Sequence, residues 1–285
     1  MKLHQQIAIL NLIAFAAAFL FSMLGQTDIV GQYSMAEISA MHETAITPAG
    51  FTFSIWALLY LALAVMTVGH VLIAFRKPEN YVVNRELEIM GPLFATNQAA
   101  IALWVYFWLN NYVGISLVLI LVQLLSLYGI GQRLRLLNPK LGKTSLFLTQ
   151  FPLSMYFAWI TIATLANFAA WIHSLGWLAS VSADVYMGYI LLLVAIAVGF
   201  STIYFRHNVF FGLVYIWAFY GIVMKRMQID DTAYSYIVYL CAVGIAVFLL
   251  SIIVVVLRFR NIEAKPYQLR KKTSTSNSFK PEENS

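Results

Sequence analysis

The sequence SMYFAWITIATLANFAAW occupies residues 154–171, inside a longer run from Leu146 to Ile172 that is apolar on nearly every side. A helix needs about 20 mostly apolar residues to cross a membrane, because each residue rises about 1.5 Å through a hydrocarbon layer roughly 30 Å thick. A transmembrane β-barrel would instead show strands of about 10 residues with alternating polarity. The run therefore predicts a transmembrane helix and an all-α membrane fold.

The composition of the whole chain agrees with a membrane protein. Of its 285 residues, 61% are hydrophobic and 11% are charged, which lies outside the usual range of soluble domains. The net charge of +6 comes from short basic clusters between apolar runs and near the C-terminus. We interpret these clusters as topology signals and expect no nucleic-acid partner. Cys241 has no second cysteine with which to form an intrachain disulfide.

Eight apolar runs predict a polytopic helical bundle with eight membrane spans. The seventh run is the shortest, so we expect it to be tilted, broken or partly re-entrant. The predicted spans are Ile7–Leu24, Phe51–Ala74, Met90–Leu109, Val113–Ile130, Ser145–Trp171, Val185–Tyr204, Val209–Val223 and Tyr234–Leu257.

The basic residues predict the orientation of these spans, because loops rich in lysine and arginine stay cytoplasmic. With the N-terminus inside, every lysine and arginine except Lys225 and Arg226 falls on the inner side. Asp230 and Asp231 follow that pair and could neutralise it. We therefore expect a multi-pass protein of the plasma membrane with both termini in the cytoplasm.

Both ends of the chain leave alternatives open. The first apolar run follows Lys2 and could be a cleaved signal peptide, but no small-x-small cleavage site follows Leu24, so we favour an uncleaved helix. Residues 259–285 form a polar, basic tail that we expect to be disordered and to fix topology. Its basic half could alternatively bind anionic lipid head groups.

Three motifs, in order along the chain, resemble the TspO family, the tryptophan-rich sensory or translocator proteins. Residues 47–63 read TPAGFTFSIWALLYLAL, similar to the family's proline- and glycine-containing loop entering a helix with W-x-L-L-Y. Residues 97–108, NQAAIALWVYFW, resemble its third helix. Residues 154–171 resemble its pattern Y-x-A-W-x-x-x-A-T-x-x-N. The matching residues are Pro48, Gly50, Phe53, Trp56, Leu59, Tyr60, Trp104, Phe107, Trp108, Tyr156, Ala158, Trp159, Ala163, Thr164, Asn167 and Trp171.

The resemblance covers residues 7–173 and implies a division of the chain. We expect a TspO-like five-helix core at residues 1–175, three additional transmembrane helices at residues 176–258, and the tail at residues 259–285. The chain departs from the family pattern at Ile46 and Phe51, where family members carry tryptophan, and at Ala49, where they carry proline. It also lacks the serine-proline pair that follows the third-helix tryptophan.

Helical spacing places the aromatic residues of three predicted helices on one face each. If these faces converge, as the resemblance implies, they enclose a cavity suited to a flat apolar ligand such as a porphyrin or haem. No cofactor is required by this interpretation. A single stripe could equally be helix packing, and the two asparagines could be interhelical hydrogen-bonding groups. The candidate ligand-binding residues are Phe53, Trp56, Tyr60, Asn97, Trp104, Trp108, Tyr156, Trp159 and Asn167.

The outer loop offers further candidates. By resemblance, the segment Gln26–Ile46 covers the pocket. His42 in that segment and His173 at the end of the fifth span could reach a bound tetrapyrrole or its metal, although interfacial histidines are usually only solvated.

We favour a membrane-bound binding or sensory protein, with lipid and a hydrophobic small molecule as partners and a homodimer expected by resemblance. The alternative is a transporter or channel for a hydrophobic molecule, although His70 is the single Asp, Glu, Lys, Arg or His residue that we find within the predicted spans. Conventional catalysis is not expected, since the spans lack HExxH and paired-carboxylate motifs; porphyrin photodegradation is implied by resemblance alone. The last three helices could also serve only to bind a partner protein.

Overall fold

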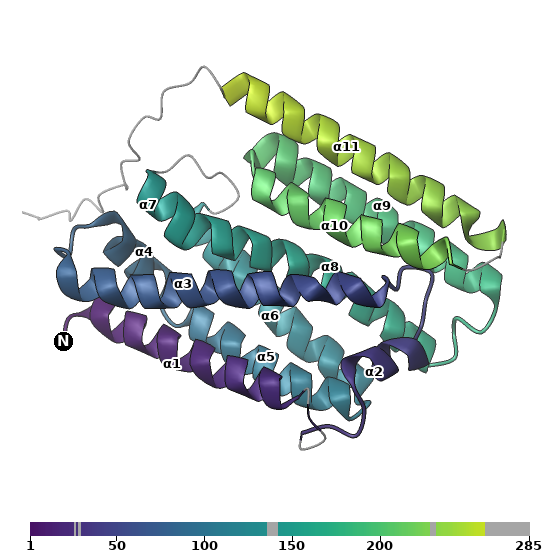
Figure 1. The fold of residues 1–285 in the computed structure, drawn as a ribbon, viewed down its shortest axis with the longest axis horizontal. Helices are drawn as coiled ribbons and strands as arrows, with labels where there is room; N and C mark the ends of the chain where they lie inside the picture. Colours follow the sequence, from purple (N-terminus) through teal and green to yellow (C-terminus); the bar gives the residue numbers. More distant parts are fainter. Residues whose placement is uncertain (26, 28–29, 136–141, 229–231, 260–285) are drawn as a thin grey trace, which may run out of the picture.

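The structure is a computed structural model that describes residues 1–25, 27, 30–135, 142–228 and 232–259. Within these ranges every regular element is a helix (Figure 1). The long helices are α1 (Leu3–Leu24), α3 (Ile55–Arg76), α5 (Leu93–Leu109), α6 (Val113–Leu134), α8 (Phe151–Ser174), α9 (Val181–Arg206), α10 (Val209–Arg226) and α11 (Ser235–Phe259). The short elements are α2 (Met35–Met41), α4 (Val82–Met90), α7 (Lys143–Ser145), the 3₁₀ turns η1 (Gly50–Ser54) and η3 (Thr232–Tyr234), and the π-helical segment η2 (Leu146–Gln150).

The long helices coincide with the eight predicted spans. Among the described residues, seven helical segments are long and apolar enough to cross a membrane, and α5, with 17 residues, is a shorter apolar helix. The expectation of a broken seventh span is wrong, because α10 is one continuous helix of 18 residues. It continues through Lys225 and Arg226, where Glu43 pairs with both cations.

Glycine and proline set the boundary between α4 and α5. Gly91 adopts a φ of 56°, a left-handed conformation that side chains with a Cβ rarely adopt. Pro92 follows it and cannot donate a backbone hydrogen bond. The third span therefore begins at Leu93 instead of the predicted Met90, and α4 stands apart as a short helix.

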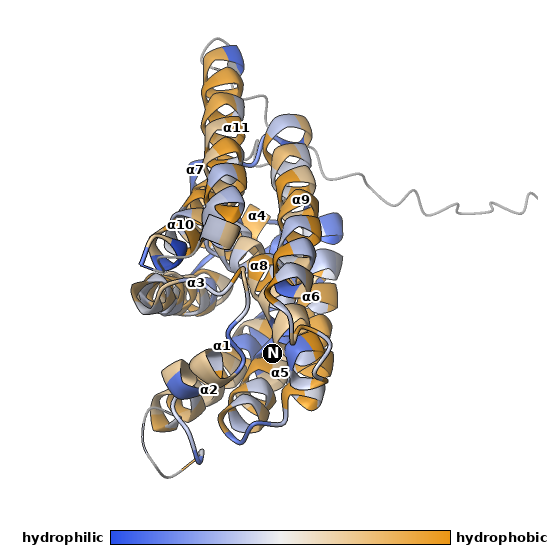
Figure 2. Cartoon of the chain, turned by 90° about the vertical axis from the view of Figure 1, so that its right-hand side faces the viewer, coloured by the Kyte–Doolittle hydropathy of each residue, from blue (hydrophilic) through white to orange (hydrophobic). Residues whose placement is uncertain are grey.

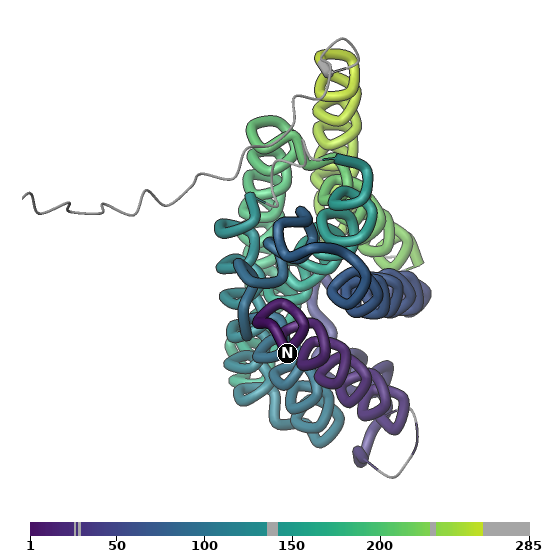
Figure 3. The backbone as a smooth tube through the Cα atoms, turned by 90° about the vertical axis from the view of Figure 1, so that its left-hand side faces the viewer, coloured from purple at the N-terminus to yellow at the C-terminus, as the bar shows by residue number. Residues whose placement is uncertain are grey.

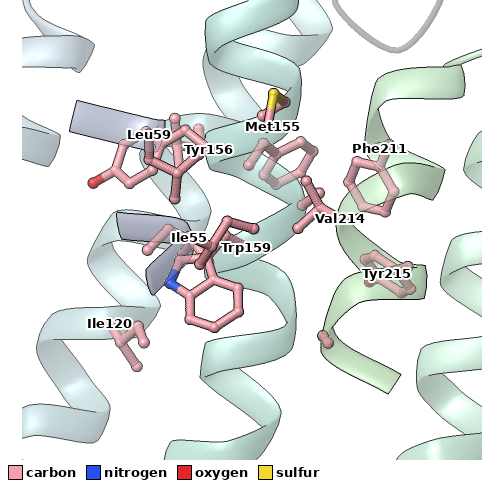
Figure 4. Packing of buried hydrophobic residues seen from close by; sticks show 14 of the residues in the cluster. Ile55, Leu59, Ile120, Met155, Tyr156, Trp159, Phe211, Val214 and Tyr215 are labelled. Atoms are coloured by element: carbon pink, nitrogen blue, oxygen red, sulfur yellow. The ribbon is translucent and has the colours of Figure 1, made fainter. Parts of the chain in front are cut away.

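The helices form one bundle with a continuous apolar interior. α8 lies in the middle and packs against α3, α6 and α10, while α11 lies outermost on α9 and α10 (Figures 1 and 3). Phe157 of α8 and Phe211 of α10 have ring centroids 5.8 Å apart. Figure 4 shows buried side chains of α8, including Met155 and Trp159, in the same part of the core as Phe211 and Val214 of α10. The hydrophobic core thus runs from the first five spans into the last three.

The two described chain ends lie at the same end of the bundle, as an even number of spans requires (Figure 1). We call this the α4 end, because α4 and α7 lie there, and the opposite end the α2 end. Arg76, Arg206 and Arg258 lie at or near the C-terminal ends of α3, α9 and α11. Hydrophobic residues run along most of α11 (Figure 2), and many of its side chains, including Tyr239 and Leu250, are exposed on the outer surface.

Candidate functional site

A cavity of about 730 Å³ lies among α1, α3, α5, α8, α9 and α10. At the α2 end it is bordered by α2 and by the following segment, residues 42–49, which we call the lid segment. Its lining is mostly apolar and contains a large share of aromatic side chains.

Most of the predicted ligand-binding residues share this cavity. Helical spacing predicted one aromatic face on each of α3, α5 and α8, and these faces converge on the cavity, as the family resemblance implied. Those that line it are Phe53, Trp56, Tyr60, Trp104, Trp108, Trp159 and Asn167.

The aromatic rings contact each other in defined geometries. The ring of Trp56 stacks on that of Tyr60 at 5.4 Å and meets that of Trp159 edge to face at 6.1 Å and 84°. On α5, Trp104 and Trp108 stack at 5.6 Å with their planes 16° apart. Such ring pairs hold one another in place, so they form a rigid wall for a ligand to stack on.

Asn97 and Tyr156 do not line the cavity. Asn97 is fully buried and donates from Nδ2 to the Gln123 carbonyl oxygen and to Ser126 Oγ, each at 3.0 Å, so it joins α5 to α6. Tyr156 is also fully buried and lies one helical turn before Trp159, with its ring 6.4 Å from that of Trp56. Both residues have the predicted periodicity, but they lie closer to the α4 end, where the helices pack directly against one another.

Asn167 lines the cavity but uses its amide within the wall. Its Oδ1 accepts a hydrogen bond from Trp104 Nε1 at 3.1 Å, and its Nδ2 donates to the Ala163 carbonyl oxygen at 2.9 Å. It therefore serves as the interhelical hydrogen-bonding group that the sequence offered as an alternative to ligand contact.

Trp159 has a different polar environment. Its side chain is 3% exposed, and its indole Nε1 has no hydrogen-bond partner among the described residues. A buried N–H without an acceptor costs free energy, so Trp159 contributes an unsatisfied donor to the cavity wall.

Helices α9 and α10 complete the wall, which motif comparison within the first five spans did not reveal. The lining from these helices includes Leu192 and Ala195 of α9, and Ala218 and Phe219 of α10. The sequence carried a weak signal, since small residues on apolar helices mark sites of close packing or of open space.

The lid segment is held to α9 and α10 by polar contacts. The Ala45 amide donates to Asp184 Oδ1 at 2.9 Å, and the Ala49 amide donates to the Gly221 carbonyl oxygen at 2.9 Å. Glu43 binds Lys225 at 3.0 Å and Arg226 at 2.6 Å.

These ion pairs affect the protonation of Glu43. Partial burial acts to raise the pKa of its carboxyl, but the hydrogen bonds and charges of Lys225 and Arg226 outweigh that effect and hold the pKa below its ordinary value. Glu43 thus has the role that the sequence suggested for Asp230 and Asp231, which lie outside the described residues.

The two candidate histidines meet at the α2 end. Their ring centroids are 5.7 Å apart, and His42 Nε2 lies 2.7 Å from Asn111 Oδ1. Of the two, His42 lines the cavity. Within the described ranges, no group of three or more His, Cys, Asp or Glu side chains is arranged to hold a metal ion.

The cavity reaches the outer surface of the bundle between α1 and α3. Two of its lining residues are well exposed there, Met23 of α1 at 41% and Leu61 of α3 at 63%. In a membrane this surface faces lipid, so the cavity has a lateral opening toward the hydrocarbon phase.

The fold and site define a multi-pass helical integral membrane protein with an aromatic-walled cavity. A family model described as TSPO-like protein matches residues 8–254, and the chain belongs to this family. The match covers α9, α10 and most of α11 as well as the first five spans. No curated protein and no solved structure matches the chain.

Proposed function

We propose that this protein is a TspO-type binding or sensory protein that holds a porphyrin or a similarly flat, hydrophobic ligand in the aromatic-walled cavity. The observation that carries the proposal is the convergence of Trp56, Trp104 and Trp159, from three different helices, on one hollow. The proposal includes the predicted setting, a plasma membrane with both termini in the cytoplasm.

The size and chemistry of the cavity support this class of ligand. Its volume of about 730 Å³ falls within the range of about 300–1,000 Å³ that is common for small-molecule sites. Stacked rings favour a planar molecule, because its face can stack on theirs.

The lateral opening and the lid segment support uptake from the bilayer. A ligand of this kind dissolves in lipid, so an entrance between α1 and α3 lets it arrive without crossing water. At the α2 end, the ion pairs of Glu43 hold the lid segment closed.

The test is a titration of the purified full-length protein in detergent with protoporphyrin IX, followed by tryptophan fluorescence. We expect saturable quenching in the wild type and at least about tenfold weaker binding in Trp56→Phe and Trp159→Phe, a loss of roughly 1.4 kcal/mol or more. Trp177→Phe is the matched control, because Trp177 is 67% exposed and does not line the cavity.

Two results would reject the proposal. One is the absence of saturable binding; the other is equal affinity in all three variants and the wild type. Ligand flux across liposomes containing the protein, without saturable binding in detergent, would favour the transporter alternative.

A further inference from the structure

Glu86 on α4 is buried in a polar cluster outside the cavity. Its side chain is 3% exposed and accepts hydrogen bonds from Ser145 Oγ, from Thr149 Oγ1 at 2.8 Å and from Gln150 Nε2 at 3.3 Å. Thr149 Oγ1 in turn lies 3.0 Å from Nε2 of His70, which is fully buried on α3. A single hydroxyl therefore connects two titratable side chains from different helices.

The position of Glu86 follows from the amphipathic pattern of α4. Val83, Leu87 and Met90 share a helix face with Glu86, and all four are buried. Sequence inspection placed this stretch in a basic loop between two spans, because Arg76, Lys77 and Arg85 lie nearby. The helical spacing of residues 83, 86, 87 and 90 was the signal that could have revealed a buried carboxyl group.

No ion pair neutralises Glu86 in the part of the chain that the structure describes. Its direct partners are two hydroxyls and an amide, none of which carries charge. The charged groups on the surrounding elements are directed elsewhere. His4 of α1 binds Glu88, and Lys2 binds Glu79. The remaining cations near this cluster, among the described residues, are exposed; they are Arg76 at the end of α3, Lys77 after it, Arg85 of α4, Arg133 of α6, Arg135 after α6 and Lys143 of α7.

A buried carboxylate without a cation is costly, so it binds either a proton or a metal ion. The contacts favour a proton. Thr149 Oγ1 lies 2.8 Å from Glu86 Oε2, in direct hydrogen-bond contact, and within the described residues no group of three His, Cys, Asp or Glu side chains surrounds this carboxyl group. Burial also raises the pKa of the Glu86 carboxyl, an effect that exceeds the opposing effect of its three hydrogen bonds.

We propose that Glu86, Thr149 and His70 form a buried proton-binding site, in which Glu86 carries the proton and the Thr149 hydroxyl links it to His70. When Thr149 donates to the carboxylate, its oxygen accepts from His70 Nε2–H, because the hydroxyl has only one hydrogen. A proton that binds His70 at Nδ1 can then pass along the chain. The Nε2 proton moves to Thr149, the Thr149 proton moves to Glu86 Oε2, and His70 is left neutral with its hydrogen on Nδ1.

The local backbone places this site against a helix that also forms the cavity wall. Ser145 closes α7, and Thr149 and Gln150 lie in η2, the π-helical segment that leads directly into α8. Single π-helical turns within α-helices are frequent at functional sites. Gln150 also retains a buried Oε1 without a partner among the described residues. The proton site does not depend on the proposed ligand.

Glu86 makes the stability of the folded protein depend on pH in a defined direction. A raised carboxyl pKa means that the folded state binds the proton more tightly than the unfolded state, whose pKa lies near 4.5. The resulting stabilisation is present below that pH and is lost as pH rises through the folded-state pKa. In Glu86→Gln the side chain is neutral at every pH, so this loss of stability at higher pH is absent.

The direct test is infrared spectroscopy of the full-length protein during a pH titration. We expect the carbonyl stretch of a protonated carboxylic acid to persist above the pH range in which an exposed glutamate loses its proton. The band should be absent in Glu86→Gln. In Thr149→Val its midpoint should rise, because the carboxylate loses a donor. Thr164→Val is the matched control, since the Thr164 hydroxyl bonds only the Ile160 carbonyl oxygen of its own helix.

Three results would overturn the proposal: absence of the band in the wild type, its persistence in Glu86→Gln, or an unchanged midpoint in Thr149→Val. If Glu86→Gln does not fold, the wild-type band and the Thr149→Val shift still decide the question. A final experiment compares the thermal unfolding temperature in sodium chloride with that in choline chloride. Stabilisation specific to sodium, without the infrared band, would assign the site to a metal ion.

Discussion

Trp104 on α5 donates its indole N–H to Oδ1 of Asn167 on α8 at 3.1 Å, and this bond joins two walls of the cavity. Both side chains are more than nine-tenths buried. A buried hydrogen bond of this kind contributes little by its formation, but removing one partner leaves the other without compensation. The pair therefore fixes the position of an aromatic ring that a ligand would contact.

Asn167→Ala should lower the free energy of unfolding by about 1–3 kcal/mol, because Trp104 Nε1 is left buried without an acceptor. Trp104→Phe removes the donor from the other side. In thermal unfolding experiments the double variant should lose less stability than the sum of the two single variants, with a coupling of about 0.5–1.5 kcal/mol. Additive losses would show that the bond does not join the two helices energetically.

Filling the cavity from α9 should block ligand uptake without unfolding the protein. Ala195 is buried and lines the cavity, so Ala195→Phe places a ring in the open space. We expect protoporphyrin affinity to fall by at least about tenfold, or roughly 1.4 kcal/mol, with thermal stability unchanged or higher. Leu193→Phe is the control, because Leu193 is 56% exposed on the same helix. Equal affinity in both variants would argue against α9 as part of the site.

Glu43→Gln should loosen the lid segment. The variant loses the ion pairs to Lys225 and Arg226, and we expect a stability loss of about 1–3 kcal/mol together with faster ligand dissociation. Glu79→Gln is the control, since the pair of Glu79 with Lys2 is largely exposed and should contribute less than about 1 kcal/mol.

Acidification should affect the wild type more than Glu43→Gln. The pKa of Glu43 is lowered in the folded protein, so its stabilisation is present above the unfolded value of 4.5 and is lost as pH falls through the folded-state pKa. Unfolding temperatures measured over that acidic range would reveal the difference. Parallel curves for the two proteins would contradict the role of Glu43.

Gly221→Ala should displace the lid segment through a steric effect. A Cβ at this position would overlap the side chain of Thr52, which lies in η1, the turn that follows the lid segment. Overpacking of this kind costs about 1–3 kcal/mol, measurable by thermal unfolding. Gly142→Ala meets no atom within 4 Å and should change stability by less than about 0.5 kcal/mol. A tolerated Gly221→Ala would indicate that the lid segment shifts freely.

The sequence alone determined the membrane fold, the eight apolar helices and the aromatic faces of α3, α5 and α8. These properties depend on hydrophobicity and helical periodicity, which act over a few turns of one helix and so can be predicted from residues close in the chain. The family motifs around Trp56, Trp104 and Trp159 are equally local, and they identified three of the helices that line the cavity.

Only the tertiary structure decided how deep the cavity reaches and which distant segments complete it. It separated Asn97 and Tyr156 from the cavity, placed Ala195 and Ala218 in the wall, and paired Glu43 with Lys225 and Arg226. It also buried Glu86 beside Thr149. These relations join residues tens to nearly two hundred positions apart, and they depend on how the helices pack in three dimensions, which no periodicity within one helix records.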